Sequence, residues 1–315
     1  MTSRRSLLLV PFGAGLLRAK ASQPSTPVNI AVPKGACDCH THIFGDPAAF
    51  PFAKERSYTP EQALPREMLA LHKALHVDRV VIVTPSVYGT DNSATAAGIR
   101  SVGLKRARGI AVIAADTSAR ELSALDRAGF RGIRLNFGVG AAPDLDAMRS
   151  RLRRSIEQVK PLGWHIQIYT NLAAITKLEA DLMAAAPMRI VLDHVCGAVP
   201  ELGVGQAGFE ALLRLVRAGH VSVKITHRFI STARHPQDAG PLAQALIAAN
   251  RDCMLWGTDW PHPDSAGRPG RKATDVAPFE AIDDGAFLNL FGLWAGSALR
   301  GILVENPARL YGFVA

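Results

Sequence analysis

Short β-branched segments and longer amphipathic segments alternate eight times along the chain, and this alternation limits the fold more than any other feature. The strand-like segments are 36–42, 79–84, 109–114, 132–137, 165–169, 190–194, 221–226 and 254–259. Helix-like stretches between them include 65–75, 90–105, 119–128, 145–162, 172–186, 209–218 and 241–250. Strands rich in Val, Ile and Leu that alternate with helices are typical of a parallel sheet covered by helices.

Eight such units in 315 residues predict an α/β fold, namely a single-domain (β/α)₈ TIM barrel that spans residues 35–315. An open, doubly wound sheet is the alternative. No Gly-x-Gly-x-x-Gly pattern follows the first strand-like segment, which argues against a dinucleotide-binding version of that sheet.

The first residues have the composition of an export signal. Ser3-Arg4-Arg5 precedes a run of leucines, and a small-x-small site follows at 19–21. This arrangement resembles a twin-arginine leader, and the apolar run is too short to span a bilayer permanently. We therefore predict an export signal over 1–21, an irregular lead-in over 22–34, and a periplasmic protein that leaves the membrane after signal removal. A leader that does not function would leave the protein in the cytoplasm.

The net charge of +9 raises the question of a nucleic-acid partner. The 36 Lys and Arg residues are scattered, without a long basic run or interleaved aromatics, so nucleic acid is not expected. Some arginines are better suited to a small anionic organic acid. Self-association into a homo-oligomer stays open.

Polar residues gather where the predicted strands end. Asp38, His40 and His42 alternate along the first strand, so we expect them to share one face, with Cys37 and Cys39 buried on the other. His194 ends the sixth strand and Asp259 ends the eighth. In a parallel barrel the carboxyl ends of strands form the ligand-binding rim. Burying so many polar groups is costly unless they bind something or each other.

Two chemistries use such a set. Three histidines and an aspartate can ligate one divalent metal, zinc more readily than manganese, whose bound water becomes a nucleophile near neutral pH. Alternatively, Asp259 acts as general base for water while His40, His42 and His194 polarise a carbonyl, and no metal is required.

Several motifs in this order resemble the amidohydrolase superfamily, in its amidohydrolase-related (type 2) branch, and within it the 2-pyrone-4,6-dicarboxylate lactonase group. They span nearly all of the chain after residue 36: CDCHTHIFG from Cys37, RSYTP from Arg56, TPSVYGTDN from Thr84, RGIRLNF from Arg131, LDH from Leu192, GTDWPHP from Gly257 and NPARLY from Asn306. The resemblance implies a barrel whose reaction centre is His40, His42, His194 and Asp259. It also implies that lactonases of this kind can act without a tightly bound metal, whereas decarboxylases and other hydrolases of the branch use zinc or manganese.

The fourth and fifth strands bear on the metal. Metal-dependent relatives usually have a histidine late on the fifth strand, where this chain has Tyr169, with His165 deeper in the strand. The fourth strand ends without the lysine that bridges two metals in some relatives. A two-metal site is therefore not expected.

Cationic and hydroxyl side chains near the same rim are candidates for holding an anionic substrate. Arginine matches carboxylates in a bidentate way, which favours Arg134 and Arg228. The resemblance adds Tyr58, Ser86, Tyr169, His262 and Arg131 to the substrate-binding set. The lactonase group tends to carry an arginine shortly after the strand-six histidine, where this chain has Cys196. One carboxylate-binding arginine is therefore missing, and this argues against 2-pyrone-4,6-dicarboxylate itself as the substrate.

The sequence thus predicts a lactonase-type hydrolase that opens a small carboxylated lactone, 2-pyrone-dicarboxylate-like or muconolactone-like. The alternative is a zinc- or manganese-dependent decarboxylase of an aromatic or unsaturated carboxylic acid. A third reading is an exported binding protein that captures an organic acid without turnover.

Overall fold

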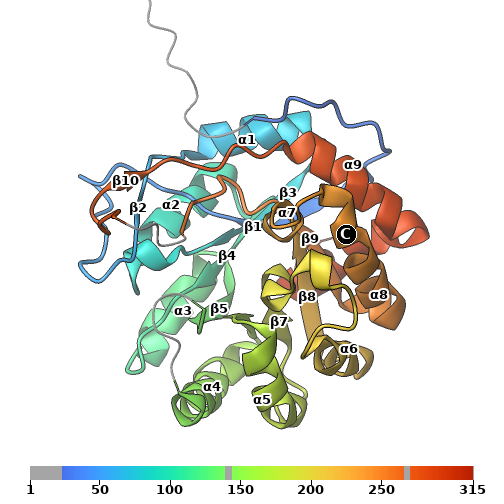
Figure 1. The fold of residues 1–315 in the computed structure, drawn as a ribbon. Coiled ribbons are helices and arrows are strands. Elements are labelled where there is room, and N and C mark those ends of the chain that lie inside the picture. The colour runs from blue at the N-terminus through green and yellow to red at the C-terminus, as the bar shows by residue number, and fades with distance from the viewer. Residues whose placement is uncertain (1–22, 139–143, 266–269, 315) are drawn as a thin grey trace, which may run out of the picture.

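Eight parallel strands form a ring in the computed structural model, which describes residues 23–138, 144–265 and 270–314 (Figure 1). In spatial order they are β1 (Cys37–Thr41), β3 (Arg79–Val83), β4 (Ala107–Ala111), β5 (Phe130–Asn136), β6 (His165–Tyr169), β7 (Ile190–Leu192), β8 (Val221–Thr226) and β9 (Met254–Gly257). The ring closes where the amide of Asp259 donates to the carbonyl of His40 (2.8 Å) and the amide of His42 donates to that of Trp260 (2.8 Å). The predicted TIM barrel is confirmed.

Helices surround this ring (Figure 1). They are α1 (Pro65–Ala74), α2 (Ser93–Val102), α3 (Ala119–Arg127), α4 (Leu145–Val159), α5 (Leu172–Ala184), α6 (Phe209–Arg217), α7 (His227–Ser231), α8 (Gly240–Asn250), α9 (Asp284–Ala295) and α10 (Asn306–Tyr311). Short helical turns are η1 (Ser86–Tyr88), η2 (Lys160–Leu162), η3 (His194–Gly197), η4 (Pro200–Leu202), η5 (Pro236–Ala239), η6 (Arg251–Cys253), η7 (Gly296–Ala298) and η8 (Gly301–Glu305). A second small parallel sheet pairs β2 (Thr59–Pro60) with β10 (Val276–Ala277).

Local sequence signals explain where several helices begin. Ser118 accepts a hydrogen bond from the amide of Glu121, and the Glu121 carboxylate accepts one from the amide of Ser118, which is a capping box at the start of α3. Asp144 and Asn171 cap α4 and α5 in the same way, through their side-chain oxygens. The predicted helix over 90–105 is shorter in the structure because α2 ends before Gly103, whose positive φ of 90° stops a helix.

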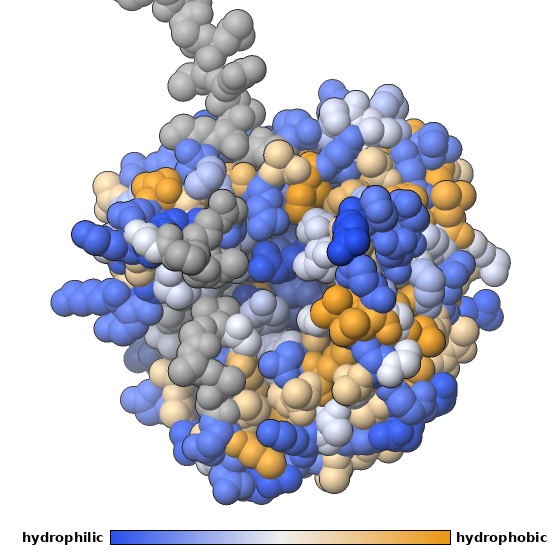
Figure 2. Space-filling model, viewed as in Figure 1, coloured by the Kyte–Doolittle hydropathy of each residue, from blue (hydrophilic) through white to orange (hydrophobic). Residues whose placement is uncertain are grey.

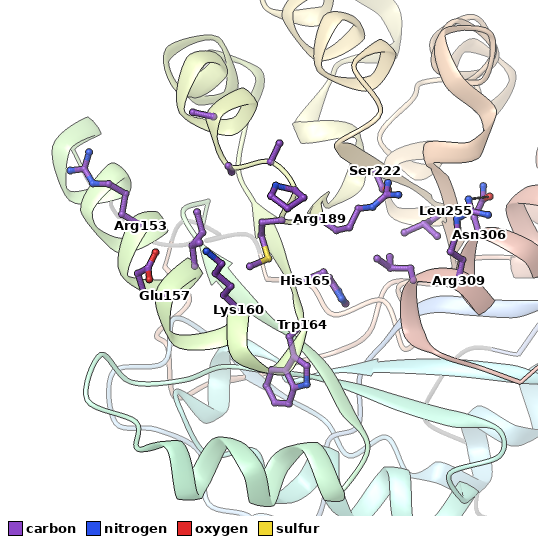
Figure 3. A pocket seen from close by; sticks show the side chains of 18 of the residues that line it. Arg153, Glu157, Lys160, Trp164, His165, Arg189, Ser222, Leu255, Asn306 and Arg309 are labelled. Carbon is purple, nitrogen blue, oxygen red and sulfur yellow. Dashed lines mark hydrogen bonds between the residues drawn. The ribbon is translucent and has the colours of Figure 1, made fainter.

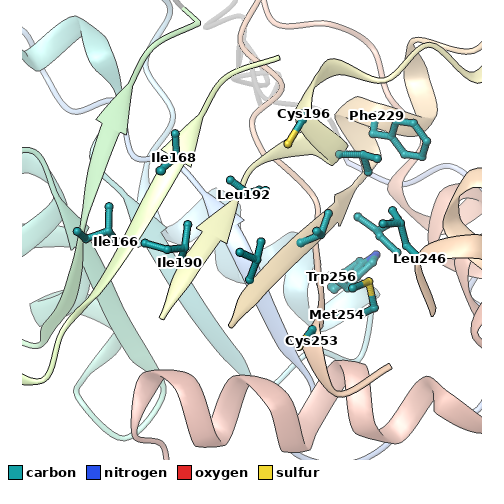
Figure 4. Packing of buried hydrophobic residues seen from close by; sticks show 14 of the residues in the cluster. Ile166, Ile168, Ile190, Leu192, Cys196, Phe229, Leu246, Cys253, Met254 and Trp256 are labelled. Carbon is teal, nitrogen blue, oxygen red and sulfur yellow. The ribbon is translucent and has the colours of Figure 1, made fainter. Parts of the chain in front are cut away.

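Most of the hydrophobic core lies between the outer face of the ring and the helices. Outward residues of β6, β7 and β9, among them Ile166, Ile190 and Trp256, belong to it (Figure 4). A smaller cluster contains Cys37, Cys39, Val81, Val191 and Leu255, which come from strands on different sides of the ring and therefore fill its interior.

The position of the cysteines corrects one prediction. Cys37 and Cys39 are buried, as expected, but they point into the barrel, whereas Asp38 points out and receives a hydrogen bond from His72 on α1 (3.2 Å). The pairing of β1 with β3 shifts register between Asp38 and Thr41. Such an irregularity interrupts the alternation of a strand, so Asp38 and His40 do not share a face.

The predicted export signal over 1–21 lies outside the described residues. Within the part of the chain that the structure describes, no single helix is long and apolar enough to cross a membrane. Two consecutive segments, Asp284–Ala298 and Gly301–Tyr311, meet that test only when taken together, and they are bent by 101° relative to each other.

Candidate active site

Four polar side chains from three strands meet at the carboxyl end of the barrel. The Oδ1 atom of Asp259 lies 3.4 Å from Nε2 of His40, 3.4 Å from Nε2 of His42 and 3.9 Å from Nε2 of His194. All four residues are at most 6% exposed. Three imidazole nitrogens therefore surround a single carboxylate oxygen.

The backbone at two of these residues is unusual. Asp259 has a φ of 68° and His194 a φ of 50°, and the left-handed conformation continues through Val195 and Cys196. Non-glycine residues rarely adopt this conformation, which costs free energy and is concentrated at functional sites. Here it turns both side chains inward directly after β7 and β9.

The second nitrogen of each imidazole has a partner that fixes the ring. Nδ1 of His42 lies 2.8 Å from the carbonyl oxygen of Val83, so that nitrogen carries a hydrogen. Nδ1 of His194 lies 2.8 Å from Oγ1 of Thr226, whose hydroxyl can donate to it. Nδ1 of His40 lies 3.3 Å from Asp193 and 3.4 Å from Nζ of Lys224. The three rings are thus held so that Nε2 faces Asp259.

A buried layer of polar residues supports the cluster from below. Nζ of Lys224 donates to Oε1 of Gln167 (2.6 Å), and Nε2 of Gln167 donates to Oδ2 of Asp193 (2.9 Å). Lys224, Gln167 and Asp193 are all fully buried. Sequence reasoning missed this layer. The signal was present, because a lysine and a glutamine occupy inward positions of otherwise apolar strands, in VSVKIT and HIQIY.

Electrostatics separate the protonation states of these groups. Burial alone would raise the pKa of Asp259, but the electrostatic interaction of its carboxylate with the three imidazoles, that of His194 the largest, outweighs burial and lowers the pKa. Burial lowers the pKa of His194 to about 4, and burial with the charge of Lys224 lowers that of His40. The site therefore presents an ionised carboxylate next to neutral His40 and His194 at neutral pH.

Several predicted substrate-binding residues lie around the cluster. Arg228 places Nη1 3.8 Å from Oδ2 of Asp259, and Arg134 places Nε 3.3 Å from Asp193 with its guanidinium 5.2 Å from the ring of Tyr169. The Tyr169 ring packs edge-on against His194, with 5.4 Å between centroids. Burial raises the pKa of Tyr58, whose hydroxyl also shares a hydrogen bond with Ser86 and feels the charges of Arg134 and Asp259.

These side chains open toward solvent on one face. On the face shown in Figure 2, the surface is hollowed near its centre, over the ring of strands, and hydrophilic side chains gather around the hollow. The side chain of Arg228 is 22% exposed and that of Asp259 3%, so Arg228 is the more accessible of the two to solvent.

Two residues of the predicted set do not join this group. Arg131 lies near the start of β5, at the other end of the barrel, and pairs with Asp126 (3.1 Å). His262 is 1% exposed and its Nε2 lies 3.0 Å from Oδ2 of Asp284, the first residue of α9. The motifs predicted both near the rim. Arg131 lies at the other end of the barrel, whereas His262 stays beside Asp259, to whose carbonyl oxygen its amide donates (2.8 Å), with its side chain paired to Asp284.

Three of the four side chains are placed to hold one metal ion, whereas His194 falls in a second such group with His40 and Asp193. The Nε2 atom of His40 and Oδ1 of Asp259 are buried without a hydrogen-bond partner among the described residues. His40, His42 and Asp259 each offer a ligand atom within 4.8 Å of the others. Imidazole nitrogens and a carboxylate oxygen are ligand types that zinc accepts. Inward positions at the end of β5 hold Arg134 and Asn136, so no bridging lysine is present there for a second ion.

Comparison with known proteins places the chain in a family. The profile of the amidohydrolase family matches residues 37–313. The chain is 36% identical over 298 residues to a 4-sulfomuconolactone hydrolase of Rhizobium radiobacter (92% of this chain, 94% of the relative). It is 33% identical over 303 residues to a 2-pyrone-4,6-dicarboxylate hydrolase of Comamonas testosteroni (92% and 94%).

A solved structure from Pseudomonas putida, described as a 2-pyrone-4,6-dicarboxylic acid hydrolase, superposes with a TM-score of 0.74 at 26% identity, covering 91% of this chain and all of that one. The shared barrel and the coverage of nearly the whole chain agree with the family resemblance of the sequence motifs. The chain belongs to the amidohydrolase family and is an enzyme of the lactonase type.

Proposed function

We propose that this protein hydrolyses a small carboxylated lactone, 2-pyrone-dicarboxylate-like or muconolactone-like, with Asp259 as the general base. The observation that carries this proposal is the Oδ1 atom of Asp259, which is ionised, buried and without a hydrogen-bond partner in the described part of the chain, yet surrounded by three imidazoles. A carboxylate in that state can take a proton from a water molecule that attacks the ester carbonyl. Both curated relatives are named as hydrolases of lactones or pyrones.

The histidines contribute to the same step in different ways. His40 and His194 are neutral, and Nδ1 of His194 can accept from Thr226, which leaves a hydrogen on its Nε2. Nδ1 of His40 lies between the Asp193 carboxylate (3.3 Å) and Lys224 (3.4 Å), and our proposal takes the tautomer in which it accepts from Lys224 and Nε2 carries the hydrogen. In our proposal those two Nε2–H groups donate to the carbonyl oxygen and stabilise the oxyanion that develops on it. The hydrogen of His42 is committed to Val83, so its Nε2 donates only when the ring is doubly protonated.

In this proposal, the carboxylate of the substrate binds to the arginines near the cluster, Arg228 and Arg134. Arg228 is 22% exposed and adjoins Asp259, so it can meet a carboxylate from solvent and place the lactone over the base. Arg134 already shares its charge with Asp193. Cys196 is fully buried in the hydrophobic core (Figure 4) and cannot supply an anion contact. These contacts favour a lactone with one carboxylate over a dicarboxylate.

A divalent ion, if bound, would be held by His40, His42, His194 and Asp259. It would supply Lewis-acid polarisation of the carbonyl and a more acidic water. The cations of Arg228 and Lys224, which already adjoin Asp259 and His40, offset part of the negative charge that attracts such an ion.

The experiment that tests this proposal is a substrate panel. Purified protein is assayed with muconolactone, 2-pyrone-4,6-dicarboxylate and a set of aromatic carboxylates, each with added zinc and with a chelator, and both ring opening and CO₂ release are measured. We expect ring opening of a carboxylated lactone without CO₂. Zinc-dependent CO₂ release from an aromatic acid, with no ring opening, would instead establish the decarboxylase alternative.

A further inference from the structure

A second cavity lies at the opposite end of the barrel from the four-residue cluster. Its volume is about 800 Å³, within the range of small-molecule sites. Its walls come from α4 and η2, from the segment between α5 and β7, and from α10. Figure 3 shows the labelled side chains of these elements arranged around the opening, with His165 between them.

The floor of this cavity is formed by the first inward residues of three strands. His165 of β6, Ser222 of β8 and Leu255 of β9 line it and are 3%, 7% and 1% exposed. No side chain among the described residues hydrogen-bonds a ring nitrogen of His165, and the contact of the ring with the backbone of Arg131 does not meet hydrogen-bond geometry. A buried imidazole without a partner is costly, and a ligand that supplies one would remove that cost.

The walls are cationic. Five basic side chains line the cavity, Arg153, Arg154, Lys160, Arg189 and Arg309, against two acidic ones, Glu157 and Asp252. Arg309 donates to the carbonyl oxygen of Asp252 (3.0 Å) and to Oδ1 of Asn306 (2.8 Å), and Arg189 donates to the carbonyl oxygen of Gly219 (3.0 Å). These partners are neutral oxygens, so they orient the two guanidinium groups without cancelling their charge.

The remaining three basic residues carry free charge. Across residues 23–138, 144–265 and 270–314, no ion pair joins Arg153, Arg154 or Lys160 to a carboxylate. A cavity with this excess of cations attracts an anion. Arginine and lysine at its rim are suited to a carboxylate or a sulfonate.

An apolar surface accompanies the charge. Trp164, Met188, Ile156 and Leu310 line the same cavity. The indole N–H of Trp164 donates to Asp126 (2.8 Å), so the ring is fixed and offers carbon atoms to the lining. A ligand here should therefore combine a flat apolar body with an acid group.

We propose that this cavity is a binding site for an aromatic organic acid, separate from the catalytic cluster. The acid group is held by Arg153, Arg154 and Lys160, the ring packs on Met188 and Leu310, and His165 supplies a hydrogen bond at the floor.

The site is distinct from the catalytic one, yet strands join the two. On β6, His165 at the floor is followed by Gln167 in the middle layer and Tyr169 at the rim, and on β8 Ser222 is followed by Lys224 and Thr226. At about 3.3 Å per residue, floor and rim are roughly 13 Å apart. One buried polar layer separates them.

The test uses 2-naphthoate as the probe, with calorimetric titration of the full-length protein. 2-Naphthamide tests the need for charge and acetate tests the need for an apolar body. We expect 2-naphthoate to bind at one site, and both comparison compounds to bind at least about 10-fold more weakly.

Charge-reversal variants locate the binding. In the double variant R153E/K160E, which changes exposed residues of α4 and η2, we expect 2-naphthoate to bind at least about 10-fold more weakly with lactone turnover unchanged. R100E on α2 is the matched control, because Arg100 is exposed and far from the cavity lining. Equal affinity for R153E/K160E and wild type would overturn the proposal, as would displacement of 2-naphthoate by the lactone substrate or the absence of binding.

Discussion

At the scale of single residues, Lys224 is the side chain with the largest role that the sequence did not disclose. It is fully buried, and burial lowers its pKa while the charge of Asp193 opposes that effect. Its ammonium links Gln167, Asp193 and His40. Lys224 is a positioning residue, because its ammonium contacts His40, Gln167 and Asp193, and within the described residues it forms no ion pair with Asp259.

Replacing Lys224 by methionine should destabilise the protein. The variant leaves the buried charge of Asp193 with one cation fewer, and breaking a buried charge pair costs about 3 kcal/mol of unfolding free energy. Chemical denaturation measures this loss, with K105M at an exposed position as the control. An unfolding midpoint for K224M that matches that of K105M would show that the buried pair contributes nothing to stability.

Arg228 is assigned to the substrate carboxylate, which gives a kinetic prediction. Hydrogen bonds to charged groups contribute about 1.5–3 kcal/mol, so R228Q should raise KM for a carboxylated lactone about 10- to 100-fold. The effect on kcat should be smaller. Steady-state kinetics of R228Q and of the exposed control R234Q test this, and an unchanged KM in R228Q would remove Arg228 from substrate binding.

At the scale of elements, the sequence predicted the order and type of the barrel strands because period-2 and period-3.6 patterns are local. It failed at β1. The expectation that Asp38, His40 and His42 share a face rests on strict alternation, which the register shift between Asp38 and Thr41 breaks. The middle layer of Gln167, Asp193 and Lys224 was also missed, because its partners lie on three different strands and only the folded barrel brings them together.

The start of α9 is tied to the rim by a buried carboxylate. Oδ1 of Asp284 lies 2.5 Å from Nδ1 of His227 and Oδ2 lies 3.0 Å from Nε2 of His262. Burial would raise the pKa of Asp284, but the charges and hydrogen bonds of His262 and His227 lower it to about 2, and the same pairing raises the pKa of His262 against the effect of burial.

These shifts give a pH dependence with a defined sign. The lowered pKa of Asp284 contributes stability above its unfolded value, near pH 4, and that stability is lost as pH falls through about 2. The raised pKa of His262 contributes below about pH 6.5 and is lost as pH rises through its folded value. The contribution of the pair should therefore be complete between roughly pH 4 and 6.5.

We expect D284N to lower the unfolding free energy by about 2 kcal/mol in that window, the amount that corresponds to a shift from 3.8 to about 2. Unfolding curves at several pH values measure it. D146N is the matched control, because the Asp146 side chain is 94% exposed. A D284N deficit that is the same at pH 2 as at pH 5 would contradict this assignment.

At the scale of the whole molecule, the barrel places two sites at its two ends. The sequence predicted the rim correctly as the place where strand-end histidines and aspartates gather, because a closed parallel sheet brings all carboxyl ends to one side. It also predicted that Arg134 and Arg228 lie near that rim, but it wrongly added Arg131, which pairs with Asp126 at the other end of the barrel.

The four donors also predict a response to zinc. An ion that binds only the folded protein stabilises it, by about 2.7 kcal/mol at a concentration 100 times its Kd. An ion held at His42 would raise the melting temperature of the wild type and have little effect on H42N, with H235N, at an exposed position, behaving like the wild type. Equal zinc shifts in wild type and H42N would place the ion elsewhere.

The most direct test of the central claim is kcat/KM for ring opening of a carboxylated lactone by D259N. General base catalysis contributes about 10²- to 10⁴-fold, so we predict a loss of about 10³-fold, with the exposed control D46N close to wild type. A D259N variant that retains kcat/KM within about threefold of wild type, far smaller than a general base contributes, would contradict the assignment of Asp259 as the base.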